Sequence, residues 1–379
     1  MRLAVLKERA PGEARVAATP ETVRKYIVLG LSVAVEAGAG LGSSISDAQF
    51  AEAGAEIAPG PAEALAGAGV VLAVQMPGAE LRGMIPRGAL LVCVANAASD
   101  PALVPALAQA GVDVAAMELL PRITRAQSMD VLSSQSNLSG YRAVIEGAAA
   151  FERGFPMMMT AAGTVPPARV FILGAGVAGL QAIATARRLG AIVSATDVRP
   201  AAKEEIKSLG AAFVGVEDTE TAGQTGAYAR QMSEDFLRRQ GELVAATAAK
   251  SDLVICTALV QGRRAPVLLS QAAVDGMKPG SVVVDLAADQ GGNCAATVPG
   301  QEITTANGVK VLGWRNWPAR IAVAASQLYA RNLLTFLTLF WHKEEKRPHL
   351  PTDDEIVRGV MLTRAGASVH PLFQPAPAA

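Results

Sequence analysis

One short stretch constrains the fold of this chain more than any other. Residues 174–179 read Gly-Ala-Gly-Val-Ala-Gly, directly after the apolar run 170–173 and directly before a helical pattern at 180–189. A second apolar run, 191–196, ends in an acid, Asp197, close to the spacing of ~20 residues that follows such a turn in dinucleotide-binding domains. This order of strand, glycine turn, helix and strand predicts an α/β domain that binds a dinucleotide.

The glycines of this turn have separate expected roles. We expect Gly174 to permit the tight turn, Gly176 to let the backbone approach a pyrophosphate, and Gly179 to let the helix lie close to the strand. The N-terminus of the helix at 180–189 is expected to offer free N–H groups and the positive end of its dipole to the phosphates, and Val177 is expected to contact the cofactor.

The residues after the second strand predict which dinucleotide is bound. Asp197 is expected to accept hydrogen bonds from the adenosine ribose, and its carboxylate repels a 2′-phosphate, so NAD is favoured over NADP. Arg199 complicates this, because a nearby arginine can accommodate a phosphate. Val198, which lies between these two residues, is also expected to contact the dinucleotide.

The rest of the chain alternates short apolar runs with helical patterns, which is typical of parallel α/β sheets. We predict two Rossmann-like, doubly wound domains with a nucleotide-binding cleft between them. The first covers 1–133 and, because the C-terminal segment is expected to pack back onto it, 326–379; the NAD-binding domain covers 134–325. The pattern at 325–340 predicts an amphipathic helix with Arg331 and Asn332 away from its apolar face.

Two other stretches are predicted to be irregular. Residues 155–168 end in two prolines and are expected to form a linker. Residues 38–43 are also glycine-rich and follow a strand, but the sixth position is Ser43, so we interpret them as a plain turn.

Composition excludes several classes of function. Lys+Arg and Asp+Glu both number 34, and a net charge of zero argues against nucleic-acid binding. No run reaches the ~18–20 apolar residues of a membrane-spanning helix. The three cysteines are too far apart for a zinc or redox motif, so no metal is expected. All three histidines follow residue 341, so the chemistry of the first 341 residues proceeds without imidazole.

A polar stretch at 121–137 interrupts the α/β pattern between the two domains. Its polar side chains, which include Arg122, Arg125, Gln127, Asp130 and Ser133, are expected to face the cleft where a nicotinamide ring would lie. A solvated linker with an internal ion pair remains the alternative.

Three strings, at 117–144, 174–200 and 285–293, resemble the NAD(H)-binding soluble subunit (domain I, alpha subunit) of proton-translocating NAD(P)+ transhydrogenase, and more distantly the alanine dehydrogenase family. The resemblance covers nearly the whole chain. It implies a homodimer on the cytoplasmic, inner face of a bacterial plasma membrane, with a membrane-spanning component and an NADP(H)-binding component as partners. Hydride would pass directly between NAD(H) on this chain and NADP(H) on the partner, in the Si-specific, proton-translocating reaction, and only with these partners present.

The resemblance also implies site residues. Those that position the nicotinamide and its ribose, and so form the catalytic set, are Arg122, Gln127, Asp130 and Ser133. Neutral hydrogen bonds from Gln127 and Ser133 suit this role, and Arg122 and Asp130 can pair to hold the loop. Tyr228 belongs to a stretch like the family's mobile loop, and Leu259 is expected beside the adenosine or ribose half.

Two rival functions remain open. A stand-alone alanine dehydrogenase-like oxidoreductase would share Arg15 and the string 289–292, but Gln75 stands where that family has a lysine, and no histidine lies near Asn96. Oxidative deamination requires a general base, whereas direct hydride transfer requires none. Arg15 and Asp289 are therefore expected to support the fold. The second rival is an NAD-sensing module without turnover.

Overall fold

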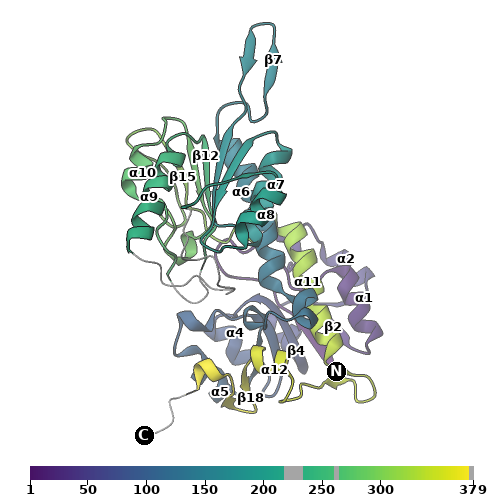
Figure 1. Cartoon of the computed structure of the whole chain (residues 1–379). Helices are drawn as coiled ribbons and strands as arrows, with labels where there is room; N and C mark the ends of the chain where they lie inside the picture. Colours follow the sequence, from purple (N-terminus) through teal and green to yellow (C-terminus); the bar gives the residue numbers. More distant parts are fainter. Residues whose placement is uncertain (217–233, 260–263, 375–379) are drawn as a thin grey trace. The chain divides into compact units, whose positions relative to one another are not determined.

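The computed structural model describes residues 1–216, 234–259 and 264–374, and the chain forms two compact units (Figure 1). Unit 1 comprises Met1–Gln135 and Ala319–Ala379, and unit 2 comprises Ser136–Pro318. Each unit is built on its own largely parallel sheet, so the predicted pair of Rossmann-like α/β sheets is confirmed. We keep as a proposal the domain bounds drawn from the sequence, with residues 1–133 and 326–379 in the first domain and 134–325 in the NAD-binding domain.

The sheet of unit 1 has eight strands in the order β19-β18-β6-β5-β4-β1-β2-β3. Their bounds are β1 Arg2–Val5, β2 Ser32–Glu36, β3 Glu56–Ala58, β4 Ala68–Gln75, β5 Leu90–Val94, β6 Asp113–Ala116, β18 Met361–Arg364 and β19 Ala367–Ser368. Strands β1 to β6 run parallel, and β18 pairs antiparallel with β6. The order reverses between β1 and β4, which makes the sheet doubly wound.

Helices cover both faces of this sheet with apolar side chains. They are α1 Pro20–Val28, α2 Asp47–Glu52, α3 Pro61–Leu65, α4 Ala79–Met84, α5 Leu103–Ala110, α11 Ala322–Leu339 and α12 Glu355–Val360. A short hairpin of β16 (Trp341–His342) and β17 (Arg347–Pro348) follows α11. Helix α11 buries most of its length, and Asn332, expected away from the apolar face, is buried as well.

The glycine-rich stretch 38–43 is a plain turn, as predicted. The second half of this stretch, Leu41–Ser43, forms a single 3₁₀ turn. A Cβ atom on Gly40 would lie 2.6 Å from the carbonyl oxygen of Ile45, and one on Gly42 would lie 2.6 Å from that of Ala14. Close packing of the backbone therefore explains these glycines.

The sheet of unit 2 has the order β11-β10-β9-β12-β13-β15-β14. Its strands are β9 Arg169–Leu173, β10 Ile192–Thr196, β11 Ala212–Phe213, β12 Leu253–Cys256, β13 Val282–Asp285, β14 Glu302–Thr304 and β15 Lys310–Leu312. Only β14 is antiparallel to its neighbour. The helices are α6 Val131–Ala150, which starts in unit 1, α7 Val177–Arg188, α8 Ala202–Ser208, α9 Glu234–Ala248 and α10 Gln271–Asp275.

The prediction that residues 155–168 form a linker was wrong. Strands β7 (Met158–Thr160) and β8 (Gly163–Val165) form an antiparallel hairpin that projects from the sheet of unit 2 (Figure 1). The hairpin was missed because each strand has three residues and because Ala161 and Ala162 replace the usual Asn-Gly turn. It leaves Met157, Met158 and Met159 exposed.

Among the described residues, no helix combines the length and the apolar character that crossing a bilayer requires. Helix α11 is long and largely apolar, and buried side chains such as Leu333 and Phe336 belong to the core of unit 1.

Candidate functional site

The glycine turn of unit 2 follows β9 and opens α7. Gly174 has φ +98°, a conformation that glycine adopts most easily. A Cβ atom on Gly179 would lie 1.9 Å from the carbonyl oxygen of Gly174, so the helix can lie this close to the turn only with glycine there. A Cβ on Gly176 would meet no atom within 4 Å, so the protein leaves open space at this position. The conformation of Gly174 and the close approach at Gly179 agree with the expected turn and packing, whereas the pyrophosphate contact at Gly176 stays a prediction.

The N-terminus of α7 has no capping side chain. Gly176 is the N-cap residue and offers none, and Val177, the first helical residue, is exposed. The last turn carries Arg187 and Arg188, which complement the helix dipole at its other end. An anion can therefore reach the first N–H groups of this helix.

Gly140 is a residue of this region that sequence reasoning missed. A Cβ atom there would lie 2.0 Å from the carbonyl oxygen of Ala178, so α6 packs directly against the first turn of α7. Glycine inside a helix costs stability, so a glycine within a predicted helix can indicate that another backbone packs closely against it. This was the signal in the sequence that could have identified Gly140. Gly140 thus helps to place the helix N-terminus.

Asp197 and Arg199 hold the middle of the glycine turn. Asp197 Oδ2 accepts a hydrogen bond from the backbone N–H of Ala175 at 2.7 Å, and Arg199 Nη2 donates to the carbonyl of the same residue at 2.9 Å. Arg199 Nε also lies 3.1 Å from Asp197 Oδ1. The guanidinium is therefore engaged by the carboxylate and the turn, while Val198 between them is exposed.

Leu259 follows β12, which neighbours β9 at the point where the strand order reverses. Its side chain is half exposed. Asn293 fixes the preceding residue: its Oδ1 accepts from Ala258 N at 3.0 Å and its Nδ2 donates to Ala258 O at 2.9 Å. Asp285, fully buried, accepts from the backbone N–H of Asn293. The string 285–293 therefore supports the backbone around Leu259.

The polar loop of unit 1 contains a 3₁₀ helix at Thr124–Met129 and leads into α6. Asp130 caps α6: its carboxylate accepts from the Ser133 backbone N–H at 2.9 Å and from the Ser133 hydroxyl at 2.5 Å. The loop is thus ordered by local hydrogen bonds, and Asp130 and Ser133 lie together.

The predicted pairing of Arg122 with Asp130 was wrong, because Asp130 serves as the helix cap. The side chains of Arg122 and Gln127 are exposed and, in the described parts of the chain, form no hydrogen bond or ion pair. Both are therefore available to a ligand. Tyr228 lies outside the described residues.

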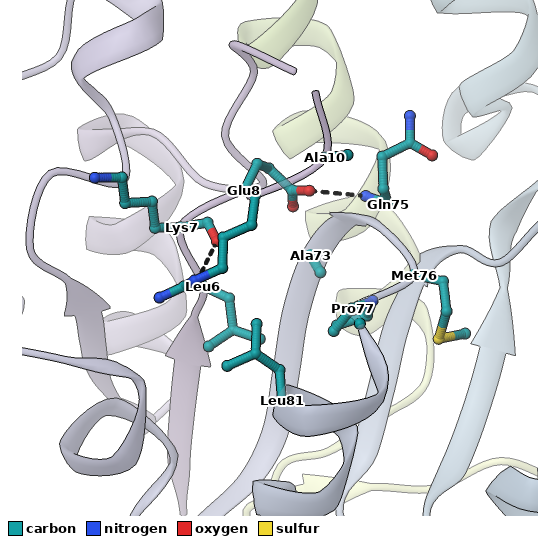
Figure 2. Close-up of a pocket in the computed structure, with 11 residues that line it drawn as sticks. Leu6, Lys7, Glu8, Ala10, Ala73, Gln75, Met76, Pro77 and Leu81 are labelled. Atoms are coloured by element: carbon teal, nitrogen blue, oxygen red, sulfur yellow. Dashed lines mark hydrogen bonds between the residues drawn. The ribbon is translucent and has the colours of Figure 1, made fainter. Parts of the chain in front are cut away.

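Unit 1 has a cavity of about 240 Å³ at the carboxyl ends of β1 and β4, where its own strand order reverses (Figure 2). Glu8 lines it and accepts hydrogen bonds from the backbone N–H groups of Val74, at 2.6 Å, and Gln75, at 3.3 Å. Burial raises the pKa of Glu8 to about 7, although these two hydrogen bonds oppose the shift. Arg9, at the same cavity, is paired with Glu36.

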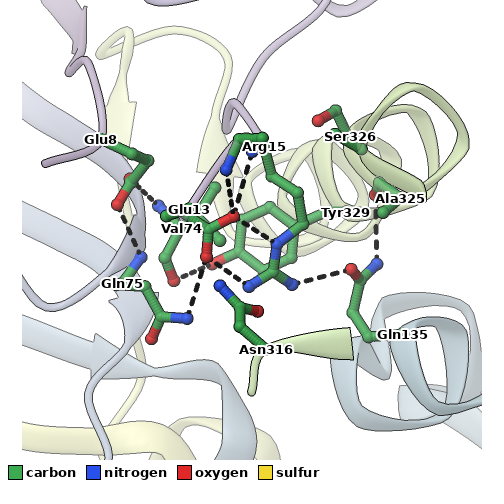
Figure 3. A network of polar contacts seen from close by, with 12 residues as sticks. Glu8, Glu13, Arg15, Val74, Gln75, Gln135, Asn316, Ala325, Ser326 and Tyr329 are labelled. Atoms are coloured by element: carbon green, nitrogen blue, oxygen red, sulfur yellow. Dashed lines mark hydrogen bonds and ion pairs between the residues drawn. The ribbon is translucent and has the colours of Figure 1, made fainter. Parts of the chain in front are cut away.

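Arg15 belongs to a buried network of polar side chains (Figure 3). Glu13 binds its guanidinium with both carboxylate oxygens, at 2.8 Å to Nε and 2.7 Å to Nη2. Nη1 donates to Gln135 Oε1 at 2.8 Å, and Gln75 Nε2 donates to Glu13 at 3.1 Å. As predicted, Arg15 supports the fold, since its charge is balanced inside unit 1.

Asp289, the other residue that was expected to support the fold, accepts a hydrogen bond from the backbone N–H of Asn316 at 2.9 Å. It also lies 3.9 Å from the guanidinium of Arg315. Both contacts join segments of unit 2, in agreement with the expectation.

Comparison with known proteins covers both units. Residues 4–139 match the family model for the N-terminal domain of alanine dehydrogenase/PNT, and residues 143–371 match the model for its C-terminal domain. An NAD(P) transhydrogenase alpha-subunit protein of Rhodospirillum rubrum is 52% identical over 378 residues, 98% of both chains. Alanine dehydrogenase of Mycobacterium tuberculosis is 34% identical, over 77% of this chain and 74% of that protein.

A solved structure agrees with this comparison. The transhydrogenase of Sinorhizobium meliloti is 49% identical, with a TM-score of 0.89 over 97% of this chain and 100% of the solved one.

Proposed function

The chain belongs to the alanine dehydrogenase/PNT family, together with the NAD(P) transhydrogenase alpha subunits, and we propose that it is the NAD(H)-binding component of a proton-translocating transhydrogenase. Hydride passes directly between NAD(H) on this chain and NADP(H) on a partner component, and a membrane-spanning component couples this transfer to proton translocation. The chain is a homodimer at the cytoplasmic face of the bacterial membrane and turns over only with its partners, in the Si-specific reaction.

The open helix N-terminus at Gly176 carries the proposal. Gly176 leaves room for a ligand, the first N–H groups of α7 have no side-chain cap, and Asp197 lies beside the same turn. Pyrophosphate therefore suits the N–H groups near Val177, and the adenosine ribose suits the carboxylate of Asp197. The engaged guanidinium of Arg199 supports selection of NAD over NADP.

The nicotinamide end of the nucleotide is assigned to the polar loop. The exposed amide of Gln127 and the guanidinium of Arg122 can donate to a carboxamide or ribose oxygen, and Asp130 and Ser133 fix the backbone beside them. The bound dinucleotide supplies the hydride. The residues of this chain need only orient the ring and exclude water, because no proton moves at the reacting carbons. Tyr228 and Leu259 complete the proposed nucleotide contacts.

The buried network at Arg15 argues against the amino-acid oxidoreductase. In that reaction an arginine and a lysine are expected to grip the substrate carboxylate. Here Glu13 balances the charge of Arg15, and the residue at the position of the lysine is Gln75, whose amide also donates to Glu13. A carboxylate substrate would have to displace a buried ion pair to bind, which is costly.

One set of assays tests the proposed function. The purified chain is titrated with NADH and with NADPH, and is then assayed with pyruvate and ammonia, alone and with an NADP-binding transhydrogenase component. We expect NADH binding at micromolar or weaker affinity, little NADPH binding, no alanine formation, and hydride transfer only with the partner. Alanine formation by the isolated chain would refute the proposal, and NADH binding without transfer in the presence of the partner would favour the NAD-sensing module.

A further inference from the structure

Asn332 of α11 is bonded to two points of the segment that carries the proposed nicotinamide contacts. Its Nδ2 donates to the backbone carbonyl of Ser128 at 2.9 Å, and its Oδ1 accepts from the hydroxyl of Ser134 at 2.7 Å. Ser128 follows Gln127 in the chain, and Ser134 follows Ser133. One side chain is therefore bonded to the immediate neighbours of two proposed site residues.

This amide lies on a rigid part of unit 1. Asn332 is 7% exposed, so losing either partner would leave a buried polar group unsatisfied. Helix α11 is fixed one turn earlier by Tyr329, whose hydroxyl donates to the carbonyls of Ala73 and Val74 at 3.0 and 3.1 Å. Leu333 and Phe336 of the same helix are fully buried. The loop is thus tied to an element that the core holds in place.

The C-terminal segment contacts the loop at two further points. A Cβ atom on Gly359 of α12 would lie 2.9 Å from Pro121 Cδ, so α12 packs closely against the start of the loop. Arg125 forms an ion pair at 2.7 Å with Asp354, the N-cap residue of α12. Arg125 is half exposed, and exposed ion pairs contribute little, so we assign the larger effect to the buried amide.

We propose that Asn332 is a positioning residue for hydride transfer, which extends the proposed function and rests on it. Asn332 fixes the Ser128 peptide and the Ser134 hydroxyl, and thereby holds Gln127 and Asp130 where they orient the nicotinamide ring. Groups of this kind must be held to within about 0.5 Å, and a misplacement of about 1 Å can cost on the order of 100-fold in rate. Loss of Asn332 therefore slows transfer more than it weakens nucleotide binding.

The test compares three variants of the full chain. Asn332→Leu has similar size and removes both hydrogen bonds of the amide. Ser134→Ala keeps the bond from Asn332 to Ser128 and removes the one to Asn332 Oδ1, together with the hydroxyl contacts to Val131 O and Gln135 Nε2. Arg331→Ala, next to Asn332 on the same helix, removes an exposed ion pair with Glu21 and is the control. With saturating NADH and the NADP-binding component, we expect Asn332→Leu to slow hydride transfer about tenfold or more while the Kd for NADH changes less than about threefold. Ser134→Ala is expected to follow in the same direction, and the control to match the wild type.

Hydrogen exchange separates this proposal from the proposed function. We expect faster amide exchange at 121–131 in Asn332→Leu and in Ser134→Ala, and no change in the control. Equal losses of rate and affinity, an unchanged rate, or unchanged exchange at this segment would each overturn the role of Asn332. If the wild-type chain transfers no hydride with its partner, the proposed function fails, whereas the exchange data still decide whether Asn332 holds the loop.

Discussion

At the scale of single residues, Gln127 carries the clearest functional prediction. Its amide is exposed and unengaged in the described structure, while Asn332 holds the carbonyl of the next residue, Ser128, and Asp130 caps α6 a few residues further along the chain. We expect Gln127→Asn, which shortens the side chain, to slow hydride transfer at least about tenfold and to weaken NADH binding much less. Stopped-flow transfer rates and NADH titrations measure the two effects.

The matched control is Gln109→Asn, on the exposed face of α5. It makes the same chemical change and should leave both quantities unaltered. If Gln127→Asn lowers affinity and rate by the same factor, the side chain provides only a binding contact.

Glu8 predicts a pH dependence of stability. Its pKa is raised from an ordinary value of 4.5 to about 7 because the carboxyl is buried beside Glu13. Between these values the folded chain holds more protons than the unfolded chain, so this group lowers stability as the pH rises through the window. The loss amounts to about 3 kcal/mol well above pH 7.

Glu8→Gln lacks this titration but can still accept the hydrogen bond from Val74. Denaturant unfolding at pH 4.5 and pH 8 is therefore expected to show the variant gaining stability over the wild type as the pH rises. A constant difference between the two proteins at both pH values would show that Glu8 titrates normally.

At the scale of elements, the contact between α6 and α7 sets the position of the phosphate-binding helix N-terminus. Gly140→Ala places a methyl group 2.0 Å from the Ala178 carbonyl, so one helix must shift. We expect NADH affinity to fall about tenfold or more and unfolding free energy to fall by about 1–3 kcal/mol. Calorimetric titration and denaturant unfolding measure these effects.

Gly241→Ala on α9 is the control, because a Cβ atom there meets nothing within 4 Å. This exposed substitution should stabilise the chain by about 0.5–1 kcal/mol and leave NADH binding unchanged. Normal NADH affinity in Gly140→Ala would show that the helix contact does not set the binding geometry.

The elements also show what the sequence could predict. The roles of Gly174 and Gly179 follow from local geometry, and so does the start of α1, where Thr19 caps the helix and Pro20 opens it. The position of Asn332 could not be predicted from helical periodicity. An amide that satisfies two polar groups 198 and 204 residues away in the chain can be buried on any face of a helix.

At the scale of the whole molecule, unit 1 is completed by the last part of the chain. Strand β18 covers the edge of β6, and Thr363 donates its hydroxyl hydrogen to the Val112 carbonyl at 2.7 Å. Truncation before Met361 would expose this edge. We expect unit 1 to exchange its amide hydrogens faster while unit 2 is unaffected, because its sheet receives no strand from this segment. Equal acceleration in both units would contradict this expectation.

The projecting β7–β8 hairpin exposes three adjacent thioethers to oxidants. Met157, Met158 and Met159 are 61%, 41% and 81% exposed, whereas Met117, Met129, Met277 and Met361 are buried. Met1 and Met84 are also exposed, at 45% and 41%, so among the described methionines dilute peroxide should oxidise Met159 and Met157 first, and peptide mass spectrometry would record the order. If an assembled partner covers the hairpin, these three sulfurs should oxidise more slowly, and the protected ones would mark the covered surface. The oxidation of these methionines would thus report whether the hairpin becomes buried when the chain assembles with a partner.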